Sequence, residues 1–534
     1  MLFPKVTSKS FALPGTVSSR AVALTLSLVA LALLSACNTN TLSTTGVSCP
    51  GATGNFNTSS LTANSQWTYY LSGVNYLTGA PYVEVGVFTV GSSGSITGRD
   101  DYYQSSFTGS YSISGNGTGS MTVNMANISG GALVWAVTLT GSGTLYVMEA
   151  DANANSAGTA YQQDTTAINT TPSGTFVFRT HVTTTGVSLG GSKATVGLMT
   201  WAGGAITGEE DILLGGTQLS SGGALNPATP VSSVSVVAPD STGTGSIQLS
   251  DGAVYNYYVI DANTMLLFDG NTGFGRAEMQ SGTFTVASLP AGSGYVFGSQ
   301  GDSSATLAVG ALGGTNSVGQ FTVDGNGGIT GGSLDAVRDG SPAALTLGAG
   351  TYIPDPTVNG RYLFNVGTVQ EAVYMVTASR GFLVVTNDAT RVEDGTMEQQ
   401  TSASFTTSDL NGQFAFVMGG DILPTISSSL EFLDRTGTVT SDGNGNLGWA
   451  EVANAGGSVT TPGCQAGTYA VTANGRVTGA VPGLPADLVF YMASPGRVYL
   501  LQNDSPVQIG GGMVQQSSTV VDPPGVFIKK GTGH

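Results

Sequence analysis

The sequence has little charge and very few histidines. Charged residues make up 9% of the 534 positions, and the two histidines are His181 and His534. A zinc site built from several histidines is therefore excluded. A coiled coil is excluded as well, because such chains are rich in Glu, Lys and Arg.

Long apolar runs are also scarce. One run extends from Ala21 to Leu34, and no later run approaches the roughly 20 apolar residues of a membrane-spanning helix. Basic residues precede this run and small residues follow it, which is the pattern of a cleaved export signal. We therefore expect residues 1–36 to be absent from the mature protein.

The end of this run carries a lipidation motif. Leu34, Ser35, Ala36 and Cys37 resemble the lipobox of bacterial lipoproteins. The resemblance implies that Cys37 is acylated and becomes the new N-terminus, and two or more acyl chains hold a protein stably at a bilayer. Asn38 follows, whereas aspartate at this position is associated with inner-membrane retention, so we expect the outer membrane. The alternative is an ordinary secretory signal followed by a chance cysteine.

Basic residues are outnumbered in the mature chain. It has 13 basic and 33 acidic residues, a formal net charge of −20. Nucleic acid is excluded as a partner, because its binding requires clusters of basic residues. The acyl anchor gives contact with the membrane, and surface glycans or envelope proteins are the candidate partners.

Glycine is the abundant residue, with 79 positions, and hydrophobic residues make up 40%. Ser, Thr and Gly interrupt short apolar runs along the whole length, which is typical of many short strands joined by tight turns. The composition therefore predicts an all-β protein.

Internal repetition divides the chain into four copies of one module. Each copy opens with two aromatic residues separated by one position, an alternation that places both rings on one face of a strand. They are candidates for packing in a core or for facing a ligand. The openers are Trp67 and Tyr69, Phe176 and Phe178, Tyr295 and Phe297, and Phe414 and Phe416.

Further landmarks recur in the same order in each copy. A Gly-rich turn is followed by Ile96, Ile206, Ile329 or Leu447, and three copies then carry Gly-[Ser/Thr]-Tyr, at Tyr111, Tyr352 and Tyr469. A second turn lies at Asn116-Gly117, Thr242-Gly243, Asn359-Gly360 and Asn474-Gly475. The copies end at Gln163, Gln280, Gln400 and Gln516. We expect these glutamines to hydrogen-bond across the seam of their own module.

Consecutive short strands joined by turns predict an antiparallel meander. At about 110 residues, each module is expected to close as an up-and-down barrel of about eight strands, with a β-sandwich as the alternative. The repeats resemble the tandem Gly-rich β repeats of uncharacterised exported proteins of acidobacteria and other environmental bacteria. That resemblance covers residues 63–518 and implies no established activity.

The predicted organisation follows from these landmarks. It comprises a signal peptide at 1–36, a flexible linker at 37–62, β repeats at 63–165, 172–283, 284–402 and 403–518, and a disordered tail at 519–534. Short joints between the repeats suggest modules in series. Cys49 and Cys464 are candidates for a disulfide, since exported chains commonly oxidise such pairs. The alternative is two unpaired thiols.

Few residues suggest catalysis. Two acidic groups, Asp100 with Asp101 and Glu209 with Glu210 and Asp211, could serve a glycosidase, and Asp335 and Glu451 stand at comparable places. We interpret them as solvated strand ends, and His181 as an ordinary strand histidine. The sequence predicts no cofactor and no enzyme activity.

Calcium is the metal that the oxygen-rich turns could hold. The weak candidate ligands are Asp324, Asn326, Asp335, Asp442 and Asn444. Only two copies have the sequence Asp-Gly-Asn-Gly at this turn. A role in forming the turn therefore accounts for all four copies, whereas calcium binding accounts for only two. We prefer the turn.

These features favour a lipid-anchored cell-envelope protein that displays tandem β modules and has a non-catalytic binding, adhesion or structural role. One alternative is a carrier that holds small apolar ligands inside the barrels. Another is a carboxylate-based glycoside hydrolase.

Overall fold

The computed structural model describes residue 49 and residues 55–75, 80–128, 132–141, 143–183, 189–219, 229–270, 272–306, 312–422, 431–484, 488–503 and 507–516. The predicted signal segment, Cys37 and the tail from 519 lie outside these residues. Among the described residues, no helix is both long and apolar enough to cross a membrane.

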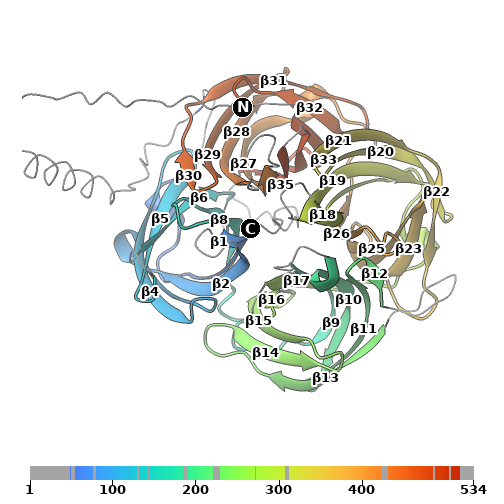
Figure 1. The fold of residues 1–534 in the computed structure, drawn as a ribbon, viewed down its shortest axis with the longest axis horizontal. Coiled ribbons are helices and arrows are strands. Elements are labelled where there is room, and N and C mark those ends of the chain that lie inside the picture. Colours follow the sequence, from blue (N-terminus) through green and yellow to red (C-terminus); the bar gives the residue numbers. More distant parts are fainter. Residues whose placement is uncertain are drawn as a thin grey trace, which may run out of the picture. The chain divides into compact units, whose positions relative to one another are not determined.

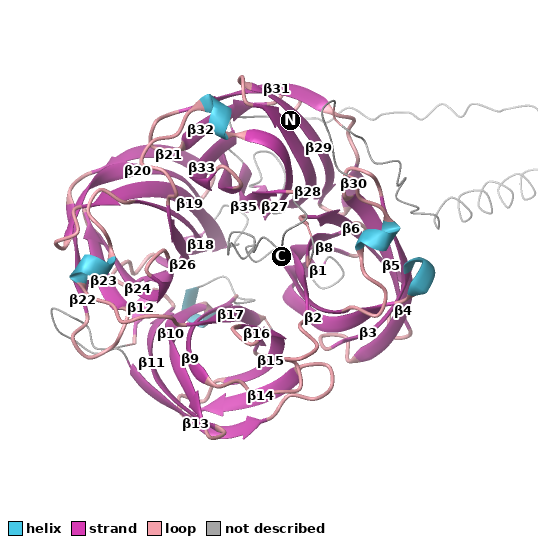
Figure 2. Ribbon diagram, turned by 180° about the vertical axis from the view of Figure 1, so that it is seen from behind, coloured by secondary structure: helices cyan, strands magenta, loops and turns pink. Residues whose placement is uncertain are grey.

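The chain folds into four closed, eight-stranded antiparallel barrels, one for each repeat (Figures 1 and 2). The predicted fold class is therefore confirmed, and the sandwich alternative is wrong. In barrel 1 each strand pairs with the next, and β8 pairs back with β1. Its strands are β1 (Gln66–Asn75), β2 (Ala80–Val90), β3 (Ser95–Asp100), β4 (Ser105–Ile113), β5 (Thr118–Met125), β6 (Ala132–Leu139), β7 (Thr144–Glu149) and β8 (Ala154–Gln162).

Barrel 2 has the same order, with one additional short strand, β12, paired to the end of β11. Its strands are β9 (Gly174–Val182), β10 (Lys193–Ala202), β11 (Ala205–Leu214), β12 (Thr217–Gln218), β13 (Thr229–Val237), β14 (Thr244–Leu249), β15 (Val254–Asp261), β16 (Thr264–Phe268) and β17 (Gly273–Met279).

Barrels 3 and 4 repeat this plan, with β21 and β30 as the additional strands. Barrel 3 has β18 (Gly294–Thr306), β19 (Leu312–Val323), β20 (Gly328–Arg338), β21 (Ser341–Leu347), β22 (Gly350–Pro354), β23 (Arg361–Val366), β24 (Val369–Thr377), β25 (Arg380–Val385) and β26 (Arg391–Gln399). Barrel 4 has β27 (Asn411–Ile422), β28 (Glu431–Asp442), β29 (Asn446–Ala455), β30 (Ser458–Thr460), β31 (Gln465–Val471), β32 (Arg476–Ala480), β33 (Leu488–Ser494), β34 (Arg497–Asn503) and β35 (Val507–Gln515).

Short 3-10 turns accompany the strands and close one end of barrels 1, 3 and 4. In barrel 3 the hydroxyl of Tyr352 donates to the carbonyl oxygens of Val286 at 3.1 Å and Leu289 at 3.5 Å. Tyr111 and Tyr469 make the same contact in barrels 1 and 4. The described part of the second copy has neither this tyrosine nor the turn that it binds. The five turns are η1 (Thr58–Ser60), η2 (Ser92–Gly94), η3 (Leu189–Gly191), η4 (Val286–Ser288) and η5 (Thr407–Asp409).

Strands near the two ends of each repeat are buried on both faces. On β2, Phe88 points into barrel 1, while Val83, Val85 and Val87 point outward and are also buried. These outward residues pack against the outward face of barrel 2, including Phe274. Equivalent apolar clusters join barrel 2 to barrel 3, barrel 3 to barrel 4, and barrel 4 back to barrel 1. The modules are consecutive along the chain, but they also share buried interfaces.

The terminal glutamines connect neighbouring barrels, so the expected bond across the seam of their own module is wrong. Each side-chain amide donates to two carbonyl oxygens of the next barrel, one at its second turn and one on the strand after it. Gln163 bonds Thr242 and Val259, Gln280 bonds Asn359 and Met375, Gln400 bonds Asn474 and Met492, and Gln516 bonds Asn116 and Leu139. We call each such pair of hydrogen bonds a latch. The fourth latch joins barrel 4 to barrel 1.

The latches explain why the second turn needs glycine. Gly243 has a φ of +79°, a conformation that L side chains rarely adopt. A Cβ atom at this position would also lie 2.8 Å from Nε2 of Gln163. Glycine therefore allows both the turn and the close approach of the latch.

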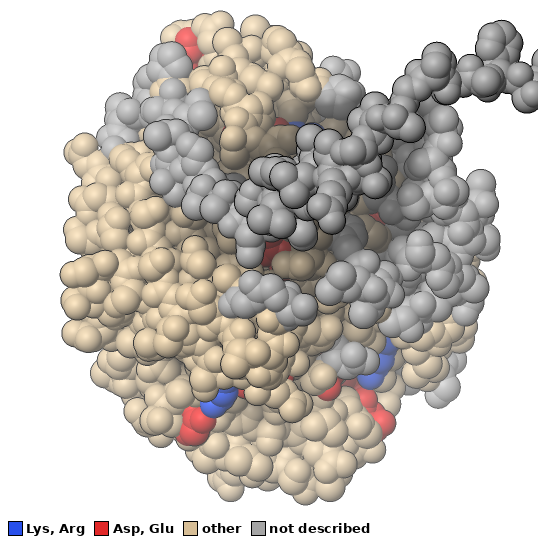
Figure 3. All heavy atoms as spheres, turned by 60° about the vertical axis from the view of Figure 1, so that its left-hand side comes forward, with Lys and Arg blue, Asp and Glu red and all other residues tan. Residues whose placement is uncertain are grey.

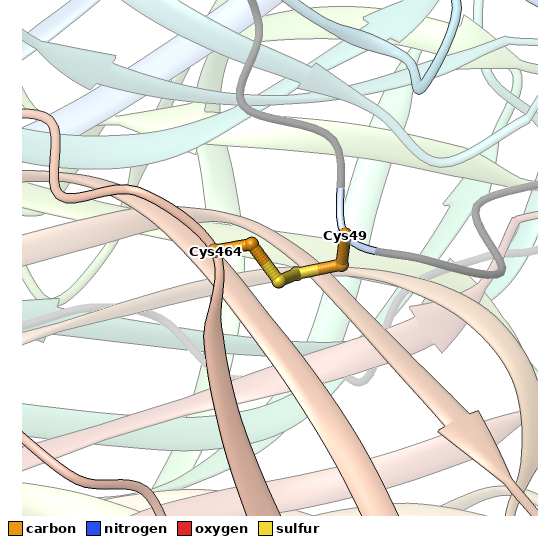
Figure 4. The surroundings of a disulfide bond; sticks show 2 residues. All are labelled: Cys49 and Cys464. Atoms are coloured by element: carbon orange, nitrogen blue, oxygen red, sulfur yellow. A yellow bond between two sulfur atoms is a disulfide. The ribbon is translucent and has the colours of Figure 1, made fainter.

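A disulfide between Cys49 and Cys464 also connects the N-terminal segment to barrel 4 (Figure 4). The Cα atoms are 5.1 Å apart, and 415 positions separate the two cysteines in the sequence. The bond lies against β29, where a Cβ atom at Gly448 would be 2.9 Å from Sγ of Cys49. The segment before barrel 1 is thus held by the last barrel.

We predict that Gln163→Ala lowers the free energy of unfolding by about 1–3 kcal/mol, because buried carbonyl groups lose their donor. The adjacent Gln162→Ala is the matched control, since Gln162 is exposed while Gln163 is 3% exposed. The control should change stability by less than about 0.5 kcal/mol. Calorimetric melting of both variants checks this, and equal melting temperatures would contradict the latch.

Candidate functional site

The aromatic openers lie inside the barrels. Trp67 stacks on Phe88 with ring centroids 6.0 Å apart, and Phe416 lies 4.2 Å from Trp449. These rings fill the barrel cores and offer no open surface for a sugar. All eight openers are between 0% and 8% exposed: Trp67, Tyr69, Phe176, Phe178, Tyr295, Phe297, Phe414 and Phe416.

The second repeat shows which of the two expected roles its openers have. Phe176 and Phe178 both belong to the hydrophobic core of barrel 2, where they pack with Trp201 and Tyr257. Phe178 is 0% exposed, and Phe176 is 1% exposed. Phe178 and Phe176 are therefore placed as core residues of barrel 2.

Barrel 1 also encloses a group of carboxyl side chains. Glu84, Asp100 and Glu149 are each 0% exposed. The hydroxyl of Tyr69 donates to Asp100 at 2.7 Å, and that of Tyr82 donates to Glu149. Among the described residues, no group of three His, Cys, Asp or Glu is arranged to hold a metal ion.

Burial favours the protonated form of two of these carboxyl groups. It raises the pKa of Glu84 well above its usual value, with further contributions from the charges of Asp100 and Glu149. It also raises the pKa of Asp100 to about 6. In barrel 2, burial raises the pKa of Glu210 to about 7. These three groups therefore keep a proton at a higher pH than a solvent-exposed carboxyl group does.

The outward acidic residues bind the next barrel, so their interpretation as solvated strand ends is wrong. Asp211 is 0% exposed and accepts from Nε and Nη2 of Arg361 at 2.7 and 2.9 Å, and from the hydroxyl of Tyr374 at 2.8 Å. Both carboxylate oxygens are occupied. Asp211 is therefore unsuited to act as a general acid or base, which needs access to substrate.

The same contact recurs at two other junctions. Asp335 accepts from Arg476 at 2.6 and 2.7 Å and from Tyr491 at 2.7 Å, which joins barrel 3 to barrel 4. Asp101 accepts from the hydroxyl of Tyr258 at 2.5 Å, which joins barrel 1 to barrel 2.

The junction between barrels 4 and 1 uses amides in place of these acids. Asn155 donates to the carbonyl oxygen of Asn454 at 2.6 Å, and Asn454 donates to the carbonyl oxygens of Glu149, Asp151 and Ala154 at 2.9, 3.2 and 3.0 Å. This junction is thus held by neutral hydrogen bonds, apolar packing, one latch and the disulfide.

His181 lies at the junction of barrels 2 and 3. Its Nδ1 atom hydrogen-bonds to Asp394, whose other oxygen lies 3.4 Å from Nη1 of Arg179. Ser192 donates to Asp302 at 2.5 Å and is fully buried. His181 is 3% exposed, so the pair of His181 and Asp394 serves the interface.

The candidate calcium ligands do not converge. The carboxylate of Asp324 accepts from the backbone N–H groups of Asn326 at 2.8 Å and Gly328 at 2.7 Å, which lowers its pKa. Asp442 makes the same turn with Asn444. The fifth candidate, Asp335, is bound to Arg476 at a barrel junction. Each turn therefore satisfies its own carboxylate.

Two sequence signals for these sites were overlooked. The turns η1, η4 and η5 each begin with a capping box. The residues that form it are Asn57 and Ser60, Thr285 and Ser288, and Thr406 and Asp409, respectively. In addition, strands that are apolar on both faces indicate burial on both faces. The second signal could have predicted that the barrels dock side by side.

We predict that Asp211→Asn lowers the free energy of unfolding by about 1–3 kcal/mol, because the buried guanidinium of Arg361 loses one of its two carboxylate partners and keeps only Asp355. The matched control is Glu209→Gln on the same strand, at a partly exposed position. Chemical denaturation followed by circular dichroism measures both variants. Similar losses in the two would contradict the role of Asp211 at the junction.

We predict that the melting temperature falls as the pH rises from about 5 to about 8. The folded pKa values of Glu84, Asp100 and Glu210 lie above the unfolded ones, so folding takes up protons and loses stability as these groups ionise. The slope is about 1.4 kcal/mol per pH unit for each proton taken up. Calorimetry should show a smaller slope for Glu84→Gln, and an unchanged slope would refute this account.

No protein-family model matches the chain, and no curated protein matches it. Two solved structures align with it at low identity. A protein of unknown function from the DUF3598 family of Nostoc punctiforme is 12% identical over 44% of this chain and 98% of its own, with a TM-score of 0.14. Transferrin-binding protein B of Haemophilus parasuis, described as a vaccine antigen, is 10% identical over 63% of this chain and 76% of its own, with a TM-score of 0.16. Similarity at this level assigns neither a family nor an activity.

Proposed function

We propose that the chain is a lipid-anchored protein of the cell envelope, and that its four docked barrels act as one rigid, non-catalytic scaffold for binding or adhesion. The observation that carries this proposal is the closed cycle of latches. Because Gln516 of barrel 4 binds Asn116 and Leu139 of barrel 1, each barrel is held by two neighbours. Rigidly spaced modules lose little entropy when several of them bind one surface.

The outer walls of the barrels fit an uncharged, hydroxyl-rich partner. Of the eleven Lys and Arg residues in the described part, ten form ion pairs, many of them buried. One face of the molecule accordingly shows few charged side chains (Figure 3). On the outer wall of barrel 1, exposed Thr97 lies opposite exposed Thr108, and Ser95 lies opposite Ser110. Rows of hydroxyl groups can hydrogen-bond to surface glycans, which supports them as the partner class.

The proposed anchor is connected to barrel 4 by a short stretch of chain. Cys37 precedes Cys49 by twelve positions, and Cys49 is bonded to Cys464 of barrel 4. Twelve residues span at most about 43 Å when fully extended. An acylated Cys37 therefore tethers the last barrel, and through the junctions it holds the whole scaffold near the membrane.

The glycosidase alternative loses its support, because the carboxylates of Asp211 and Asp335 form ion pairs with arginines of the next barrel. The carrier alternative finds support in one barrel, whose interior is described in the next subsection.

We predict that the full chain, produced in a bacterial host fed a radiolabelled fatty acid, carries the label and sediments with membranes. Cys37→Ser should abolish the label and release the protein from membranes, because the acceptor thiol is gone. Cys49→Ser is the matched control, since it removes another exported cysteine and should keep the label. Label that survives in Cys37→Ser would refute the anchor.

A further inference from the structure

Barrel 3 differs from the other barrels in how its interior is filled. The chain has four tryptophans, at 67, 135, 201 and 449, and none lies in the third repeat. Trp67 and Trp135 fill barrel 1, Trp201 fills barrel 2 and Trp449 fills barrel 4, each at most 2% exposed. The third barrel thus lacks the largest core side chain that its neighbours use.

Aligning the four repeats on their latches shows which residue barrel 3 has where the other barrels have a large core side chain. The strand carbonyl of each latch lies four residues after an inward position that is Trp135 in barrel 1, Tyr255 in barrel 2 and Leu488 in barrel 4. The same position in barrel 3, four residues before Met375, is Glu371. An ionisable side chain therefore stands where the other barrels place an aromatic or branched apolar one.

A cavity of about 60 Å³ lies inside barrel 3 at this place. One part of its wall is apolar and includes Phe297, Phe321 and Phe364, whose rings pack with centroids 5.6–6.1 Å apart. The other part is polar and includes Arg338, Glu371, Arg391 and Glu393, with Ser299 and Ser317. At about one probe sphere of 10–15 Å³ per atom, the space holds about four to six non-hydrogen atoms.

Two polar groups of the cavity wall lack a partner among the described residues. Ser317 is 3% exposed, and its Oγ atom has no hydrogen bond. Arg338 takes part in no ion pair in the described part, and its buried Nε atom has no acceptor. A buried polar group without a partner is costly, so both groups call for an acceptor in the cavity.

The acidic residues of the cavity do not provide that acceptor. Glu393 accepts from Ser299 at 2.5 Å and from Nη1 of Arg391 at 2.6 Å, so it is already engaged. Burial, with the charge of Glu393, raises the pKa of Glu371 to about 7, and Arg391 acts in the opposite direction. Below pH 7 Glu371 is largely neutral and can donate a hydrogen bond. The field of Arg338 also reaches Asp339 and Asp388.

From this geometry we propose that the interior of barrel 3 binds one small amphipathic carboxylate per chain. The carboxylate lies against Arg338 and Ser317, and its short apolar body packs on the phenylalanine rings. A carboxylate supplies the acceptor oxygens that both groups lack, and a guanidinium group matches its planar geometry. An ammonium group is disfavoured by the guanidinium of Arg338, which forms no ion pair in the described part, whereas Arg391 is already paired with Glu393. This site is independent of the membrane anchor and of the scaffold role.

The test is equilibrium dialysis of the full mature chain against radiolabelled butyrate, whose six non-hydrogen atoms match the upper end of the number that the cavity holds. We expect one equivalent bound per chain, with a dissociation constant on the order of 1 mM. Unlabelled butyrate should compete at least tenfold better than butyramide or butylamine, since neither of these carries the charged oxygens. Equal competition by butyramide would overturn the role of Arg338.

Variants separate binding from folding. Arg338→Met should weaken butyrate binding at least tenfold, and Arg338→Lys should recover part of it. Glu371→Leu places in barrel 3 the residue that barrel 4 uses, so it should abolish binding while the melting temperature stays equal or rises. Unchanged butyrate binding in both Arg338→Met and Glu371→Leu, or no binding to the unmodified chain at 50 mM butyrate, would overturn the proposal.

Discussion

The structure depends on the burial of two faces of the same strands. At the ends of each repeat, alternate side chains fill the barrel, and the intervening ones fill the junction with the next barrel, as Phe88 and Val87 do on β2. Neither surface could remain in water without exposing a large apolar patch. A single barrel of this sequence would therefore present unpaired apolar walls on two sides. In the four-barrel cycle both apolar walls of every barrel are covered. The junction of barrel 4 with barrel 1 covers the two walls that an open row of barrels would leave exposed.

Polar groups then fix which barrel meets which. The three junctions formed by consecutive repeats each have an aspartate that accepts from a tyrosine of the next barrel, at Asp101, Asp211 and Asp335, and the last two aspartates are buried. The closing junction replaces this contact with Asn155 and Asn454. A buried charge without its counter-ion is strongly destabilising, so mismatched barrels would leave such charges uncompensated. The acidic composition thus serves specificity between barrels as well as solubility.

Much of the fold could be predicted from local patterns. Short apolar runs bounded by turn residues predict individual strands such as β23, because both signals are local. Strand pairing is less local, since β21 and β22 follow each other in the sequence but pair with different parts of β20. The glutamine contacts could not be predicted, since their partners lie 74 to 400 positions away and the periodicity of one repeat does not say which barrel is adjacent. The cavity of barrel 3 was missed for a related reason. The replacement of Trp135 by Glu371 is visible only when the repeats are aligned through those contacts.

The disulfide has a consequence for the order in which the chain is completed. Cys49 leaves the ribosome before any barrel is made, while Cys464 belongs to the last one. A chain cut short before the fourth repeat has no Cys464 to bond Cys49 and no Gln516 to cover the turn at Asn116. Such a product carries a reduced thiol and an uncovered apolar wall on barrel 1. The bond between the first described residue and the last barrel therefore distinguishes, by its chemistry, a chain that contains the fourth repeat from one that ends before it.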